Sequence, residues 1–401
     1  MTELIARTSV FDRGIERGHQ AAILMPLIVK LAARNLFHDG LRFVATIIGI
    51  VFSIVLVIVQ MGLFVSFGRM VTTMIDHAPA DLWVVPLGTR CFEDPGLLDE
   101  GQRFRVLSAK GVSEVVPIAI GFSQWRVPGG RATPVFVIGS QMKGTGLHPW
   151  NLIAGNLDAL SIPDGVAVDR SYFERLNSKG RGDVAEIRDK RVEIEAVTSG
   201  IRSFTTTPYI FAPLDRARSY IGMAPNKESY LLVRLAAGAD VEDVRGQLQR
   251  TLTNAEALTP AEFAARSRSF WLFGTGAGAA LFAGALLGVI VGTVIVAQTL
   301  YSSTKDHLYE FATLRAIGSS GRYIYSIIII QALLNAGIGF AIAAVVGALV
   351  VKVTANTALP VFMPPTLTLG LFFVTVVMCM VSAVSAIVKV MRTDPAVVFA
   401  R

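Results

Sequence analysis

Residues whose types and spacing could support catalysis or ligand binding are scarce in this 401-residue chain. The five histidines are scattered without the spacing of metal ligands, and no cysteine pair accompanies them. Asp76 and His77 are adjacent and could exchange a proton, but a solvated turn beside a membrane is the simpler interpretation, since acid–base catalysis needs a defined geometry. No Gly-x-x-x-x-Gly-Lys-Ser/Thr, Gly-x-Ser-x-Gly or His-Glu-x-x-His sequence occurs. The sequence predicts no catalytic, cofactor-binding or metal-binding residue, and no enzymatic activity.

A site for contact with another protein is instead indicated by residues 301–322. This short charged segment lies between two long apolar runs, 270–300 and 323–351. Runs of that length and composition are typical of membrane spans. The segment is therefore predicted to be a coupling loop at a membrane surface.

A short amphipathic helix is predicted inside this loop, because its apolar residues recur every three positions. These are Leu308, Phe311, Leu314 and Ile317. Gly318 follows, where a helix can end in the left-handed conformation. We expect the apolar face to pack into a partner or the membrane, and Glu310 and Arg315 to make polar contacts with a partner. Ordinary contact with lipid headgroups is the alternative for both charges.

The sequence of residues 310–319, Glu-Phe-Ala-Thr-Leu-Arg-Ala-Ile-Gly-Ser, resembles the cytoplasmic loop of MacB/FtsX-type ABC transporter permeases. That loop reads approximately Arg-Glu-Ile-Gly-x-Leu-Arg-Ala-Ile-Gly-Ala, and its Leu-Arg-Ala-Ile-Gly core is matched at every position. Glu-Phe-Ala-Thr-Leu is closest to the DevC-like branch. Tyr309 stands where the family usually has Arg, and Ala312 where it often has Gly. These departures weaken a MacB or lipoprotein-release assignment more than the superfamily assignment.

The resemblance implies an export permease. Two copies would pair through their spans, and a separate ABC-type ATPase, carrying ATP and Mg, would dock on each coupling loop. ATP-driven movement would pass through the second span to an outer domain, a mechanism called mechanotransmission. A membrane-fusion protein and an outer-membrane duct are the further partners expected. The alternative is an FtsX-like regulator of a cell-wall hydrolase. An outer domain of about 200 residues is large for a simple relay, which favours the exporter.

Composition supports a membrane protein with one substantial soluble part. The chain is 52% hydrophobic and only 17% charged, whereas soluble proteins average about 25% charged residues. The net charge of +7 could suggest nucleic acid. Many of the basic residues flank the apolar runs, however, where they are typical of anchoring to lipid headgroups. We expect a lipid bilayer as partner and no nucleic acid.

The predicted fold is an α-helical membrane protein with four transmembrane helices and an α+β extracytoplasmic domain between the first two. The spans are predicted at 43–68, 269–300, 323–351 and 367–388, with a short external loop at 352–366. Basic residues beside the span ends place both termini inside, and the family resemblance implies the bacterial inner membrane. These basic residues are Arg34, Arg42, Lys305, Arg315, Arg322, Lys389, Arg392 and Arg401. The segment 1–42 is predicted to carry an interfacial helix at about 22–38, and 389–401 to be a cytoplasmic tail.

Small residues four positions apart predict a close helix contact in the second span. They are Gly276, Ala280, Gly284, Gly288 and Gly292. We expect this ridge to serve helix packing or dimerisation. The third span carries Gln331 and Asn335 one turn apart, which we expect to form hydrogen bonds between helices. The spans contain no internal proline and are therefore expected to be uninterrupted.

The extracytoplasmic domain is predicted at 69–268. Short apolar runs between turn residues indicate strands at 81–86, 115–120, 134–138, 165–169, 191–197, 208–212 and 229–235. Pro128-Gly129-Gly130 predicts a hairpin turn, and Asp240 opens a helix to 253. A β-rich insertion is expected at about 140–225. Cys91 and Cys379 lie in different regions and are not expected to form a disulfide.

Overall fold

The computed structural model describes residues 29–30, 32–34, 36–37, 40–162, 164–306, 321–355, 357 and 359–391. The chain divides into two compact units. The membrane unit comprises Met1–Gly62, Leu281–Lys352 and Val361–Arg401, and the α/β unit comprises Leu63–Ala280 and Val353–Pro360. Most of the predicted interfacial helix lies outside the described residues. Those described between 29 and 37 are helical.

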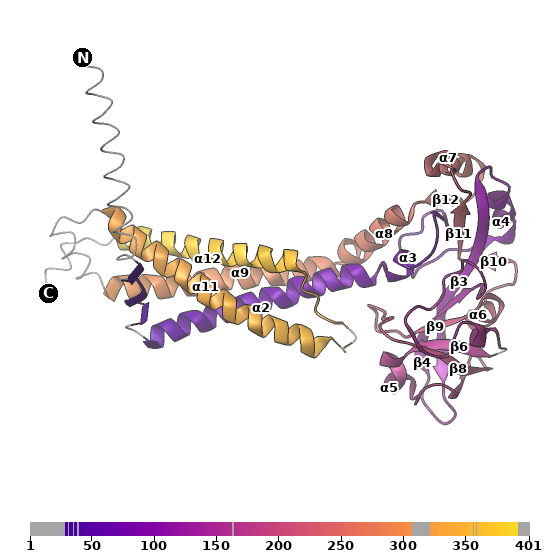
Figure 1. The fold of residues 1–401 in the computed structure, drawn as a ribbon, viewed down its shortest axis with the longest axis horizontal. Helices are drawn as coiled ribbons and strands as arrows, with labels where there is room; N and C mark the ends of the chain where they lie inside the picture. Colours follow the sequence, from indigo (N-terminus) through magenta and orange to yellow (C-terminus); the bar gives the residue numbers. More distant parts are fainter. Residues whose placement is uncertain are drawn as a thin grey trace, which may run out of the picture. The chain divides into compact units, whose positions relative to one another are not determined.

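Four helices of the described chain are long and apolar enough to cross a membrane (Figure 1). They are α2 (Gly40–Met70), α9 (Ala277–Asp306), α11 (Gly321–Thr354) and α12 (Pro365–Met391). Each has 27 residues or more, and about 20 suffice for a bilayer. This confirms the predicted class, four membrane helices with a mixed α/β domain between the first and second.

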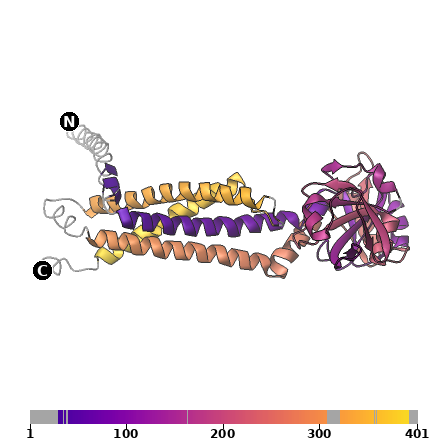
Figure 2. The same cartoon turned by 90° about the horizontal axis from the view of Figure 1, so that it is seen from below.

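Helix α2 is the most enclosed of the four membrane helices. In its most apolar 18-residue window 44% of the residues are buried, against 22% in α9. Ile50, Ile54 and Ile58 repeat one face of α2 and are fully buried. They pack with residues of α9, α11 and α12 in one apolar cluster. Figures 1 and 2 both show α9 and α11 running alongside α2.

The α/β unit is built on one mixed sheet with the strand order β12-β1-β11-β3-β4-β9-β6-β8-β5. The short strand β7 pairs with both β3 and β8, and β2 pairs with β10 in a separate small sheet. The strands are β1 (Leu82–Pro86), β2 (Leu98–Asp99), β3 (Val112–Arg126), β4 (Thr133–Ser140), β5 (Leu152–Ala154), β6 (Gly165–Asp169), β7 (Val184–Ile187), β8 (Lys190–Thr198), β9 (Tyr209–Pro213), β10 (Lys227–Glu228), β11 (Tyr230–Leu235) and β12 (Ala255–Leu258).

Strand β3 joins two lobes of this unit. Its first half, as far as Ile118, pairs with β11, and its second half, from Ala119, pairs with β4. The first lobe, with β1, β11 and β12, carries α4 (Glu100–Leu107) and α7 (Val241–Thr251). The small lobe, with β4 to β9, carries α5 (Phe173–Leu176) and α6 (Leu214–Ile221). One apolar cluster, with Trp83 and Phe136 among its members, extends through both lobes.

The strands expected from alternating or apolar runs are present, and the Pro-Gly-Gly turn does join β3 to β4. The small lobe differs from the predicted insertion at its start. It begins inside β3 rather than near residue 140, because a single 15-residue strand serves both lobes.

Candidate functional site

The predicted coupling residues all lie outside the described residues, which end at Asp306 and resume at Gly321. They are Leu308, Glu310, Phe311, Leu314, Arg315, Ile317 and Gly318. The described residue before this segment is paired with the start of another helix. Arg42, in the first turn of α2, forms an ion pair with Asp306, the last residue of α9. This contact links α9 to α2 next to the predicted coupling loop.

The small-residue ridge of α9 packs against α2 of the same chain. A side chain at Gly288 would meet Val57 Cγ2 at 3.0 Å, and one at Gly284 would meet the Gln60 amide at 2.6 Å. Ser53 donates a hydrogen bond to the Gly288 carbonyl and also lies against Gly292. These three glycines therefore serve packing within the chain rather than leaving a surface for a second copy. Ala280 is exposed.

Gln331 and Asn335 are both buried on α11. They line a cavity of about 20 Å³ together with Thr46 and Thr299. The side-chain oxygen of Asn335 has no hydrogen-bond partner in the described part of the chain. The hydrogen bonds between helices that are expected of Gln331 and Asn335 stay a prediction.

The second span is interrupted before α9, contrary to the prediction of an unbroken helix from about residue 270. Helix α8 (Pro260–Ser269) runs into a π-helical turn, Phe270–Gly274, and α9 begins only at Ala277. Gly276 has φ of +77° between them, so it is not part of the predicted glycine ridge. No proline is needed for such a break, because π-turns and left-handed glycines also interrupt helices.

The α8 segment is hydrogen-bonded to the end of α2. Arg268 Nε donates to the Gly68 carbonyl at 3.1 Å, and Ser267 Oγ donates to the Val71 carbonyl at 3.3 Å. Ser267 is fully buried. The two places where the chain enters and leaves the lobes are therefore held together directly. We call this region the joint. It comprises residues 68–71 at the end of α2, residues 267–276 from the end of α8 through the π-helical turn to Gly276, and the side chains packed on that turn.

A buried carboxyl group contacts the π-helical turn of the joint. Trp271 Nε1 donates a hydrogen bond of 2.9 Å to Glu93 Oε2, and Glu93 is 7% exposed. Burial raises the pKa of Glu93 to about 7, although the hydrogen bond from Trp271 opposes this shift. The neighbouring Tyr209 is also buried, and burial and then the charge of Glu93 raise the pKa of its hydroxyl well above the usual value. The Glu93 carboxyl group can therefore gain or lose its proton near neutral pH.

Cys91 lies close to this carboxyl group and is a free, buried thiol. Burial, with a contribution from Glu93, raises the pKa of Cys91 to about 12. Reactive cysteines have a lowered pKa and some exposure. Cys91 is therefore part of the core rather than a reactive group.

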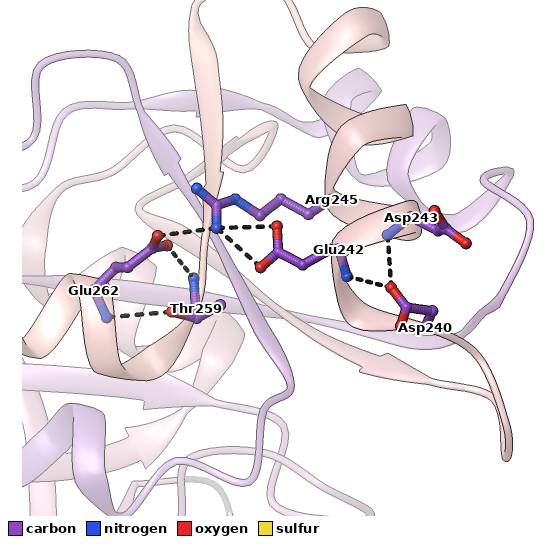
Figure 3. Close-up of polar contacts among 6 residues, drawn as sticks. All are labelled: Asp240, Glu242, Asp243, Arg245, Thr259 and Glu262. Atoms are coloured by element: carbon purple, nitrogen blue, oxygen red, sulfur yellow. Dashed lines mark hydrogen bonds and ion pairs between the residues drawn. The ribbon is translucent and has the colours of Figure 1, made fainter.

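The start of α8 is fixed to the first lobe by a network drawn in Figure 3. The Thr259 side chain accepts from the Glu262 backbone N–H, and the Glu262 carboxylate accepts from the Thr259 N–H at 3.0 Å. This is a capping box, which satisfies two otherwise unpaired donors. Arg245 of α7 forms an ion pair with Glu262 at 2.9 Å and a second with Glu242. Both ends of α8 are thus held, one by α7 and the other by α2.

The residues of the joint could not be recognised from the sequence. Glu93 and Trp271 are 178 positions apart, and neither belongs to a motif. The only local signal was the aromatic cluster at Phe270 and Trp271 directly before a glycine-rich run. Asp76 and His77, considered as an acid–base pair, lie in and just after the short helix α3 (Thr73–Asp76). Asp76 accepts from the Thr72 hydroxyl, whereas His77 contacts the Thr73 carbonyl and stacks on Trp150.

Comparisons with known proteins agree with this architecture. A MacB-like periplasmic core domain matches residues 43–251, and an FtsX-like permease C-terminal domain matches residues 279–395. An uncharacterized ABC transporter permease of Mycobacterium tuberculosis, found in strains CDC 1551 / Oshkosh and ATCC 25618 / H37Rv, is 26% identical over 384 residues. The alignment covers 92% of this chain and 98% of the relative.

Two solved structures are similar to part of the chain. The periplasmic region of MacB from Actinobacillus actinomycetemcomitans is 10% identical with a TM-score of 0.36, covering 48% of this chain and 95% of that one. The extracellular domain of the noncanonic ABC-type transporter YknZ from Gram-positive bacteria is 15% identical with a TM-score of 0.33, covering 45% and 99%. The two domain matches together span most of the chain, and the first alone spans more than half of it. The chain therefore belongs to the MacB/FtsX-type family of ABC transporter permeases.

Proposed function

We propose that this permease is the membrane subunit of an ATP-driven export complex and transmits movement rather than conducting cargo through its helices. A separate ATPase, carrying ATP and Mg, docks on residues 301–322. The observation that carries the proposal is the pair of hydrogen bonds from Ser267 and Arg268 to the end of α2. Because α8 is fixed to α2 and leads through the π-helical turn into α9, movement of α9 against α2 reaches the lobes. Two-state movements of this kind use rigid elements and short hinges.

The complete complex contains two copies of the chain in the inner membrane, with both termini in the cytoplasm. The likeness of residues 310–319 to the DevC-like branch supports a membrane-fusion protein and an outer-membrane duct as further partners. The absence of a phosphate-binding loop in the sequence supports an ATPase on another chain.

A substitution in the predicted coupling helix tests whether the ATPase acts on the permease through this helix. We expect Leu314→Asp in the full-length chain, reconstituted with its ATPase in lipid nanodiscs, to abolish permease-stimulated ATP hydrolysis. A charge on the apolar face would remain unpaired in the docked state. Thr313→Asp, on a neighbouring face of the same predicted helix, is the matched control and should retain stimulation. Stimulation by Leu314→Asp at the wild-type level would exclude this loop from the mechanism.

Co-purification separates export from regulation. The intact complex, captured through the permease, should contain a membrane-fusion protein beside the ATPase. Recovery of a peptidoglycan hydrolase in its place would reject export and support an FtsX-like regulator.

A further inference from the structure

One loop of the small lobe, residues 201–207, contacts segments next to the ends of three membrane helices. It follows β8 and precedes β9. All of its contacts described below lie inside the α/β unit. Nothing in the sequence marked this loop, because its partners are far away along the chain.

The first contact is aromatic. Phe204 is 5% exposed. Its ring packs edge-on against Trp271 of the π-helical turn, with ring centroids 4.6 Å apart, and against Phe67 of α2, at 5.1 Å. Such edge-to-face pairs contribute about 0.5–1.5 kcal/mol beyond the burial of their area. Phe204 therefore lies between the end of α2 and the turn that leads into α9.

The second contact is electrostatic. Arg202 Nη1 donates hydrogen bonds of 2.7 Å to the Ala355 carbonyl and 2.9 Å to the Thr357 carbonyl. Ala355 directly follows Thr354, the last residue of α11. The final carbonyls of a helix lack partners within the helix, and a cation is favourable there. Arg202 thus holds the connection that leaves α11.

Hydrogen bonds to the rest of the small lobe hold this loop in place. The Ile201 N–H donates to Asp169 Oδ2 at 2.8 Å, and the Ser203 N–H donates to the Tyr172 hydroxyl at 2.7 Å. Ile201 and Ser203 are both 1% exposed. Asp169 is the last residue of β6, Tyr172 follows it closely, and both are buried. The two hydrogen bonds therefore fix the backbone of the loop at two points. The loop therefore behaves as a stiff projection of the small lobe.

We propose that residues 201–207 form a clamp that makes the small lobe follow α2, α9 and α11 together. This inference rests on the proposed function and names a second route for the transmitted movement. Helix α8 carries movement into the first lobe, whereas the clamp carries it directly into the small lobe. Arg202 and Phe204 are its positioning residues.

Hydrogen exchange of the full-length chain in lipid nanodiscs, without ATPase, tests the contacts. We expect Arg202→Ala to speed amide exchange in peptides covering 353–360 by roughly tenfold, the effect of losing a charge-assisted hydrogen bond. Exchange in 263–274 should stay unchanged. Arg202→Lys should restore part of the protection. Arg181→Ala is the matched control, because that small-lobe arginine pairs with Glu195 instead. Unchanged exchange at 353–360 in Arg202→Ala would overturn the clamp.

The same measurement with the partner ATPase tests transmission. ATP binding should alter exchange both at 263–276 and at 201–207 in the wild type. In the double variant Arg202→Ala/Phe204→Ala, the change at 263–276 should persist and the change at 201–207 should disappear. A wild-type change confined to 263–276, or a change at 201–207 that survives in the double variant, rejects the clamp and leaves the proposed function standing. No ATP-dependent change at either segment rejects both.

Discussion

Glycine has opposite roles in the membrane unit and at the joint. On α11, Gly339 is buried, and a Cβ there would lie 2.5 Å from Ile50 Cγ2. On α9, a Cβ at Gly288 would lie 3.0 Å from Val57 Cγ2 of α2. At the joint, Gly276 has no atom within 4 Å of its missing Cβ, but its φ is +77°. The first two positions lack room for a side chain, whereas the third has room and a backbone conformation that side chains disfavour.

This difference follows from the two environments. Inside a bilayer the hydrophobic effect does not drive helices together, so helix association depends on van der Waals packing between closely spaced backbones. At the joint the chain must interrupt a helix, which requires a residue that accepts positive φ. The joint is then stabilised by hydrogen bonds and aromatic contacts, including a buried carboxyl group. Substitutions should therefore destabilise the membrane unit by overpacking, and the joint by backbone strain or by a change of charge.

The largest effect is expected for Gly339→Leu. Its Cβ would overlap Ile50, and overpacking by even small groups costs about 1–3 kcal/mol. We expect about 3 kcal/mol of destabilisation or more, seen as loss of monodisperse protein after detergent extraction and as a lower thermal midpoint.

Gly337→Leu supplies the control on the same helix. Gly337 is exposed and has no atom within 4 Å of a Cβ, so Leu should be tolerated there. Equal losses for the two variants would show that Leu is harmful on α11 for a reason other than contact with α2.

The membrane unit was largely readable from sequence, because apolar length and four-residue spacing are local properties. They predicted four spans and the glycines at 284, 288 and 292. The joint was not readable. The left-handed Gly276 looked like one more member of the ridge, and nothing local shows that a π-turn precedes it. Glu93 and Arg202 are ordinary charged residues until the fold buries the first against Trp271 and brings the second to Ala355.

An intermediate effect is expected from the charge of Glu93. Its native pKa of about 7 is above the unfolded value of about 4.3. The protonated form is therefore favoured by folding, and its contribution is complete below the unfolded pKa and is lost as pH rises through 7. The free energy of local unfolding of residues 263–274 should fall by about 2 kcal/mol between pH 5 and pH 7. Hydrogen exchange, corrected for the intrinsic rate, measures this change.

Glu93→Gln should remove this pH dependence, because glutamine cannot ionise. The titratable groups that face Glu93 are Cys91, Tyr209 and Tyr230, and the raised pKa of each keeps it neutral in this range. Glu228 also has a pKa raised to about 7 by burial, partly offset by nearby arginines, and should leave exchange at 263–274 unaffected when changed to Gln. A pH dependence that persists in Glu93→Gln would assign it to another group.

The smallest effect is expected for Gly276→Ala. The methyl group meets nothing, so the cost is only that of a left-handed alanine, about 1 kcal/mol. Gly276→Asn should cost less, because asparagine tolerates this conformation. Gly370→Ala, in the interior of α12 with open space around it, should instead stabilise by up to about 1 kcal/mol through helix propensity. Thermal midpoints in nanodiscs measure all three. An alanine at 276 that stabilised the protein as much as the one at 370 would mean that α8 and α9 form one continuous helix, and the contrast between the two regions would disappear.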